Sequence, residues 1–128
     1  MSSLDGKRIL VVEDEALIAA MVEDMLMELG ATVVGPASSI AQALVLVNSD
    51  DFDAAVLDVN IRSEQVDPIA EILMARNVPL VFATGYGASA HGVRYAPVIE
   101  KPYTLEKLAN ALTSALLAAA SNELPSRV

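Results

Sequence analysis

The chain has 128 residues, a length typical of one domain, and we expect a single domain over 1–128 with a core at about 7–120 and a tail at 121–128. Hydrophobic residues make up 54% of it, which excludes a disordered protein, and no apolar run reaches the ~18 residues of a membrane span. The net charge of −9 argues against direct binding to nucleic acid, and the lack of cysteine and of a visible leader fits a cytoplasmic protein.

Strands and helices are expected to alternate along the chain. Short apolar runs rich in β-branched residues predict strands at 7–12, 32–35, 54–58, 79–83 and 97–99. Helical periodicity and helix-start signals predict helices at 16–29, from Ser39, at 67–76, weakly in the glycine-rich 85–92, and from Thr104. Such alternation predicts an α/β fold with a parallel sheet and helices on both faces.

Turn and capping residues indicate where several of these elements end. Gly30 suits the left-handed residue that closes the first helix, and Pro36 is expected to stop the second strand. Ser39 and Gln42 form a Ser-x-x-Gln capping box, and Asp67 is expected to cap the third helix. The stretch between the third strand and that helix, 61–66, is expected to be a loop.

Three helices carry apolar residues at helical spacing, which predicts the faces they turn toward the core. In the helix that starts at Ser39 these residues are Ile40, Ala43, Leu44 and Val47. In the first helix these residues are Leu17, Ala20, Met21 and Met25. In the last helix they are Leu105, Leu108, Leu112 and Leu116.

Most of the predicted strands run directly into residues with acidic, hydroxyl or amino side chains. Glu13 and Asp14 follow the first strand, and Asp58 ends the third. Thr84 ends the fourth strand and Lys101 follows the fifth. Parallel α/β sheets bind ligands at the carboxyl ends of their strands, so we expect these five residues to converge on one rim.

The three acids of this rim predict a magnesium site. Carboxylates placed close together repel each other, and Mg²⁺ relieves the repulsion because it prefers hard oxygen ligands. We expect Asp14 and Asp58 to be direct ligands, with Glu13 acting mostly through water or from behind them. The backbone carbonyl of Asn60, two residues beyond Asp58, is a further expected ligand.

The remaining rim residues suit a phosphoryl group. Lys101 adds a fixed positive charge and Thr84 adds a hydroxyl donor beside the metal and the carboxylates. Phosphoryl transfer depends mainly on positioning and charge neutralisation, which such a set supplies. Asp58 is then the expected nucleophile and carries an aspartyl phosphate.

This set of residues, in this order on five strands, resembles the receiver domain of bacterial two-component response regulators. The resemblance runs from Lys7 to about Ala120 and is specific as a combination. It implies a flavodoxin-like (CheY-like) doubly wound sheet of five parallel strands in the order 2-1-3-4-5, with five helices. It also implies that a phosphohistidine on a sensor histidine kinase or a phosphotransfer protein donates to Asp58, and that the Lys101–Pro102 bond is cis.

A finer resemblance lies in the fourth strand. Its run Phe82-Ala83-Thr84-Gly85-Tyr86 is similar to the Phe-Ala-Thr-Gly-Tyr (FATGUY) signature of stand-alone receivers in alphaproteobacteria, often found beside kinases of the HWE or related type. The aromatic in Lys101-Pro102-Tyr103 fits this subgroup too. One position departs from the family: Val98 stands where most receivers carry a Tyr or Phe that turns inward as a switch.

The expected function is therefore a signalling switch that is phosphorylated on Asp58 and acts by protein–protein contact on a target that the sequence does not name. Such a protein catalyses only its own phosphorylation and dephosphorylation and is otherwise not an enzyme. The expected partners exclude nucleic acid and membrane. The same residues leave a receiver that serves as a phosphate sink without a target as an alternative.

Three further classes of protein fit the motifs less well. A haloacid-type phosphatase needs Asp-x-Asp after its first strand, whereas this chain has Asp58-Val59-Asn60 after the third. An FMN-binding flavodoxin relative would place the cofactor phosphate against the acidic run Glu13-Asp14-Glu15, which would repel it. A purely structural relative of receivers would have no need of all five rim residues.

Overall fold

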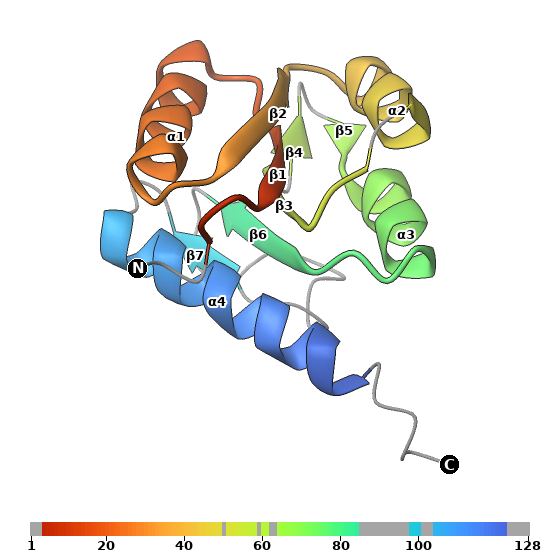
Figure 1. The fold of residues 1–128 in the computed structure, drawn as a ribbon. Coiled ribbons are helices and arrows are strands. Elements are labelled where there is room, and N and C mark those ends of the chain that lie inside the picture. Colours follow the sequence, from red (N-terminus) through yellow and green to blue (C-terminus); the bar gives the residue numbers. More distant parts are fainter. Residues whose placement is uncertain are drawn as a thin grey trace.

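The computed structural model describes residues 4–49, 51–58, 60–61, 64–84, 98–100 and 104–122, and the fold is given for these residues (Figure 1). The described helices are α1 (Ala16–Glu28), α2 (Ile40–Ser49), α3 (Asp67–Ala75) and α4 (Leu105–Asn122). The described strands are β1 (Arg8–Val12), β2 (Thr32–Ala37), β3 (Ala54–Asp58), β4 (Asn60–Ile61), β5 (Glu64–Gln65), β6 (Leu80–Thr84) and β7 (Val98–Glu100).

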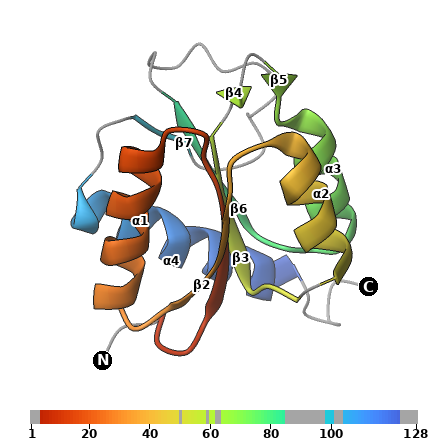
Figure 2. The same ribbon diagram turned by 90° about the horizontal axis from the view of Figure 1, so that it is seen from above.

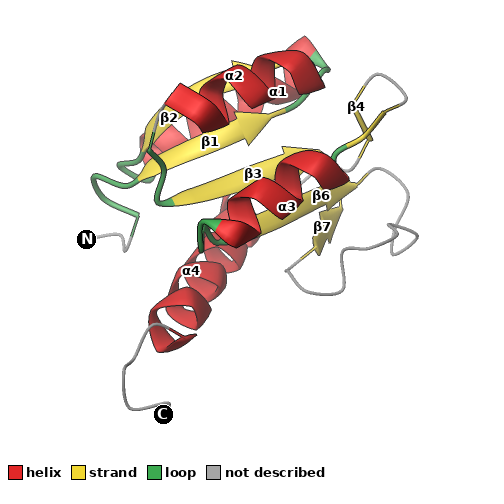
Figure 3. Ribbon diagram, turned by 90° about the vertical axis from the view of Figure 1, so that its right-hand side faces the viewer, coloured by secondary structure: helices red, strands yellow, loops and turns green. Residues whose placement is uncertain are grey.

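The central sheet has five described strands in the order β2-β1-β3-β6-β7. All four pairings are parallel, and the arrowheads of β1, β3 and β6 share one end of the sheet (Figure 3). Numbered among themselves, these strands follow the order 2-1-3-4-5 that the resemblance to receivers implied. The strand order reverses between β1 and β3, which is where doubly wound sheets open a crevice at their carboxyl ends.

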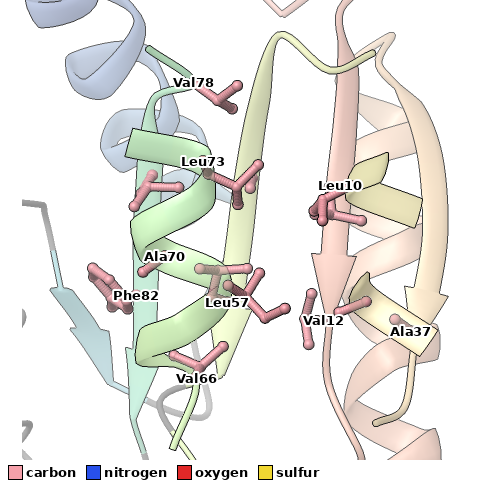
Figure 4. Packing of buried hydrophobic residues seen from close by; sticks show 14 of the residues in the cluster. Leu10, Val12, Ala37, Leu57, Val66, Ala70, Leu73, Val78 and Phe82 are labelled. Atoms are coloured by element: carbon pink, nitrogen blue, oxygen red, sulfur yellow. The ribbon is translucent and has the colours of Figure 1, made fainter. Parts of the chain in front are cut away.

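Helices cover both faces of this sheet, with α1 and α4 on one side and α2 and α3 on the other (Figure 2). Successive residues of β3 divide between the two layers: Ala55 and Leu57 join the core under α2 and α3, and Val56 joins the core under α1 and α4. All five residues of β3 are buried, as predicted for a strand covered on both faces. Figure 4 shows Leu57 and Phe82 among the side chains of α3.

The segment before β1 closes the core under α1 and α4. Leu4 is fully buried in that cluster, together with Leu26 of α1 and two leucines of α4. The Gly6 N–H donates a 2.9 Å hydrogen bond to the Gly30 carbonyl, which holds the segment against the end of α1. Gly30 has φ +85°, the left-handed conformation predicted for the residue that closes this helix.

The predicted apolar face of α1 is wrong at three of its four positions. Leu17 is 75% exposed, and Ala20 and Met21 are exposed as well, while Met25 is half-buried. The buried stripe instead comprises Ala19, Val22 and Leu26. The first two turns of α1 are apolar all round, so periodicity could not select a face, and packing against the sheet decided it.

Pro36 does not stop the second strand, because β2 continues to Ala37. The strand lies at an edge of the sheet, where a residue without an N–H is tolerated. The register explains how: Val34 lies opposite Leu10, but Ala37 lies opposite Val12, so β2 contains one extra residue. This is a β-bulge, and the Gly35–Pro36 peptide bond within it is cis.

Two other expected boundaries are corrected. Within the segment predicted as a loop, 61–66, the described residues Ile61, Glu64 and Gln65 belong to a short antiparallel pairing of β4 with β5, too brief to leave an alternating pattern in the sequence. Asp67 is the first residue of α3, and the N-cap is Val66. In addition, α4 continues to Asn122, so the first residues of the expected tail are helical.

The helix starts expected at Ser39 and Thr104 are confirmed, and both side chains cap their helices, although the return bond of the Ser39 capping box goes to Ser38. Ser39 Oγ accepts the Gln42 N–H at 3.1 Å, while Gln42 Oε1 accepts the N–H of Ser38 at 2.8 Å. Thr104 Oγ1 accepts the Lys107 N–H at 3.1 Å. In α4, two of the four predicted core leucines are fully buried and two are half-buried.

The fourth of the five expected helices, 85–92, and the Lys101–Pro102 bond lie outside the described residues. Among the described helices, none is long and apolar enough to cross a membrane.

Candidate functional site

Three acidic side chains meet where β1 and β3 end. Glu13 and Asp14 follow β1, and Asp58 is the last residue of β3. One carboxylate oxygen from each lies within 4.8 Å of the other two. The two strands are neighbours, with Val12 opposite Leu57, so the cluster lies at the carboxyl end of the sheet, where the strand order reverses.

The cluster is buried as well as acidic. Glu13 is 3% exposed and Asp58 is 6% exposed, and Asp14 is half-buried. Two ionised carboxylates 4.8 Å apart repel each other by roughly 3 kcal/mol at an effective dielectric constant of ~20. A cation bound among the three oxygens would remove that cost.

Glu13 is held from two directions. Its backbone N–H donates a 2.9 Å hydrogen bond to the Ala37 carbonyl of β2. Its Oε2 accepts the backbone N–H of Glu15, the N-cap of α1, at 3.0 Å. The edge strand therefore fixes the Glu13 backbone, and the start of the first helix fixes its carboxylate. Neither contact was predicted from the sequence.

Asp58 owes its position to the sheet. It ends a strand that is flanked by β1 on one side and β6 on the other. Its partner in β6 is Ala83. Ala83 is small and buried, so it leaves room beside the acid. An acid anchored at the end of a strand paired on both sides is preorganised, and little entropy is lost when it meets a ligand.

The donor set suits Mg²⁺. Carboxylate oxygens are the hard ligands that this ion prefers, and the chain has no cysteine that would favour a softer metal. Oxygens on one Mg²⁺ lie at most about 4.2 Å apart, because each is bound at ~2.1 Å. The three oxygens lie within 4.8 Å of one another, which is close to the spacing that one Mg²⁺ requires.

The other predicted site residues are placed less completely. Thr84 is the last residue of β6, one position beyond the neighbour of Asp58, and its backbone lies opposite Glu100. Asn60 begins β4 and pairs with Gln65 of β5. Lys101 lies outside the described residues, so its part in the site stays a prediction.

Comparison with known proteins agrees with this architecture. Residues 9–113 match the model of the response regulator receiver domain. The solution structure of SdrG from Sphingomonas melonis Fr1 is 48% identical, with a TM-score of 0.78 over 91% of this chain and 99% of that one. The crystal structure of PhyR from Brucella abortus is 26% identical, with a TM-score of 0.82 over 94% of this chain and 52% of that one.

A curated relative is longer than this chain. The transcriptional regulatory protein PdtaR of Mycobacterium tuberculosis is 29% identical over 116 residues, which cover 86% of this chain and 57% of PdtaR. The chain thus spans little more than half the length of the curated relatives it matches. The receiver match itself extends from β1 into α4 and includes all three clustered acids. The chain belongs to the response regulator receiver domain family.

Proposed function

We propose that the protein is a phosphorylatable receiver of a two-component system or phosphorelay, with Asp58 as the phosphoacceptor and Mg²⁺ as cofactor. The observation that carries the proposal is the buried cluster of Glu13, Asp14 and Asp58 within 4.8 Å. The membership of the chain in the receiver family supports the same assignment.

In the proposed reaction, a carboxylate oxygen of Asp58 attacks the phosphorus of a phosphohistidine on the donor protein. The O–P bond forms as the N–P bond breaks, and the imidazole nitrogen keeps the electron pair and takes up a proton. Mg²⁺, when bound, neutralises the clustered carboxylates and the phosphoryl oxygens. Lys101 and Thr84 are proposed to stabilise the remaining charge on the phosphoryl group.

The burial of Asp58 constrains how the donor approaches. Strands β1 and β3 are covered by helices on both faces, and Asp58 is only 6% exposed, so the donor must come from the carboxyl edge of the sheet. A site of this kind takes a phosphoryl group from a protein partner and holds it. We propose that the chain turns over no external metabolite and that it acts in the cytoplasm.

The proposed donors are a sensor histidine kinase, with the HWE type as the first to test, or a histidine phosphotransfer protein. Output would follow by protein contact with a target. A related protein supports that mode: PhyR of Bartonella quintana is named an anti-anti-sigma factor, and this chain is 25% identical to it over 52% of its length. A receiver that only drains phosphoryl groups is the second candidate, and it would bind no target after phosphorylation.

The decisive experiment is incubation with acetyl phosphate and Mg²⁺, followed by intact-mass measurement. The unmodified protein should gain one phosphoryl group and Asp58→Asn should gain none. Asp53→Asn is a matched control, because Asp53 precedes β3 at the opposite edge of the sheet, and it should gain one. A phosphoryl group on Asp58→Asn would refute the assignment. Steady hydrolysis of phosphate esters by the unmodified protein would instead favour a haloacid-type phosphatase.

A further inference from the structure

The bulge in β2 lies directly beside the point where β1 runs into the acidic cluster. Val11 of β1 faces two residues of β2, Gly35 and Pro36, because the register moves from Leu10 opposite Val34 to Val12 opposite Ala37. The extra residue therefore lies opposite Val11, two residues before Glu13. Bulges occur often next to functional sites, where they redirect a strand.

The extra residue decides which β2 residue meets the end of β1. Without it, Pro36 would lie opposite Val12, two positions after the pairing of Val34 with Leu10. Proline has no N–H and could not donate within the ladder at that place. The bulge brings Ala37 there instead, and the Ala37 carbonyl accepts the Glu13 N–H at 2.9 Å.

Only glycine fits at position 35. Its φ is +97°, a conformation that residues with a side chain rarely adopt. A Cβ on it would lie 2.8 Å from the Ala37 nitrogen and 3.0 Å from the Val11 carbonyl oxygen. Both atoms belong to the backbone and cannot turn aside, so a larger residue would push Ala37 away from β1.

The consequence reaches the candidate site in two short steps. Ala37 holds the Glu13 backbone, and the Glu13 carboxylate is held in turn by the N–H of Glu15. That carboxylate is one of the three whose oxygens lie within 4.8 Å of one another. A displacement of Ala37 would therefore change the geometry among the three acids.

We infer that Gly35 is a positioning residue for the acidic cluster: by permitting the β2 bulge, it sets the Glu13 backbone, and with it Asp14, for Mg²⁺ binding. This inference rests on the proposed function, since it needs a cation at the cluster. It assigns Gly35 no contact with the ion or with the phosphoryl group.

The test is a calorimetric Mg²⁺ titration of the unmodified protein, Gly35→Ala and Gly6→Ala. Gly6 is a matched control, because it also has a positive φ (+74°), but a Cβ there meets no atom within 4 Å and it lies before β1, at the far edge of the sheet. Both variants should lose stability to urea from backbone strain. Only Gly35→Ala should bind Mg²⁺ more weakly, by about tenfold, the usual effect of losing a group that orients a ligand.

The outcomes separate the two proposals. If the unmodified protein binds no Mg²⁺, the proposed function fails and the inference fails with it. If the unmodified protein binds Mg²⁺ and Gly35→Ala binds it equally well, the inference alone is overturned. A loss of affinity in Gly6→Ala as large as in Gly35→Ala would also overturn it, because general destabilisation would then explain both.

A second measurement needs no substitution, so it remains decisive even if Gly35→Ala does not fold. Coupling between sites is reciprocal: if Ala37 helps to position the cluster, bound Mg²⁺ must steady Ala37 in return. Amide hydrogen exchange should then slow more at Ala37 than at Thr32, at the other end of β2, whose N–H donates to Lys7 at 2.8 Å. Equal slowing at both amides would overturn the inference.

Discussion

The two ends of the sheet arrange acidic residues differently. At the amino end, Asp53 is half-buried and accepts a backbone N–H, and the exposed Asp51 pairs with an arginine. At the carboxyl end, three acids are gathered together, two of them buried. The first arrangement stabilises the fold by itself, whereas the second concentrates like charge that a cation can neutralise.

The pairings at the amino end join segments that are far apart in the sequence. Asp53 Oδ2 accepts the backbone N–H of Arg8 at 2.8 Å, and the Asp53 N–H donates to the Arg8 carbonyl at 2.7 Å. The guanidinium of Arg76 donates to the Val47 carbonyl, lies 3.3 Å from Asp51 Oδ1 and stacks 5.9 Å from the centre of the Phe52 ring. Arginine thus ties the end of α3 to the end of α2.

Arginine pairs with an acid at the amino end, whereas three acids gather where β1 and β3 end. Among the described residues this is the one group of three such acids, so it is a feature of that place and not of an acidic chain in general. If this interpretation is correct, substitutions at the carboxyl end should act through Mg²⁺, and substitutions at the amino end should act through stability alone.

The largest effect is expected for Asp14→Asn. Mg²⁺ at 100 times its dissociation constant should raise the free energy of unfolding of the unmodified protein by about 2.7 kcal/mol. Removing one clustered charge should abolish most of that gain, and it should make the metal-free protein more stable by relieving repulsion. Urea unfolding with and without Mg²⁺ measures both. An equal Mg²⁺ effect in the variant would contradict the contrast between the two ends.

A smaller loss is expected for Arg76→Met, which keeps the length of the side chain and removes its charge and donors. Arg76 is 35% exposed, so solvent screens part of its interactions, and we expect a loss of ~1–2 kcal/mol, mainly from the bond to the Val47 carbonyl. Urea unfolding checks the loss. Its Mg²⁺ affinity should match that of the unmodified protein, and a changed affinity would show that the two ends are coupled.

Asp53→Ala should cost about 1 kcal/mol, because it removes one hydrogen bond to the Arg8 N–H and leaves the backbone pairing in place. Thermal unfolding measures the loss. Phosphorylation by acetyl phosphate should proceed at the unmodified rate, since Asp53 precedes β3 and Asp58 lies at the opposite end of that strand. A slowed reaction would mean that β3 transmits strain along its length.

The smallest effect is expected for Asp51→Asn. Its side chain is 99% exposed, so water and salt screen its ion pair with Arg76. Its stability to urea should be indistinguishable from that of the unmodified protein at physiological salt. A clear loss, in either the presence or the absence of Mg²⁺, would show that exposed pairs at the amino end matter more than their burial suggests.

The sequence predicted the sheet and the acidic cluster because both follow from strong, local patterns. The uninterrupted apolar run before Asp58 indicated a strand buried on both faces, and the rule that ligands bind at carboxyl ends brought Glu13 and Asp14 beside it. Thr84 was placed at the end of its strand by the same reasoning. The role of Lys101 stays a prediction.

What the sequence did not reveal depends on packing between elements. Leu17 was assigned to the core, but the first two turns of α1 are apolar all round, and only packing against the neighbouring elements settles which side they bury. The bulge at Gly35 was hidden by taking Pro36 as a strand end. A Gly-Pro pair inside an apolar run is also the signal of a bulge in an edge strand, and only the position of β2 in the sheet distinguishes the two.

The burial of Leu4 has a practical consequence for anyone who shortens this protein. The match to the receiver family begins at residue 9 and ends at residue 113, yet Leu4 and Ala115, which lie beyond those limits, are both buried in the layer under α1 and α4. A fragment cut at the family limits would open a hole in its own interior. Trimming or tagging should therefore begin outside Leu4 and leave the second half of α4 intact.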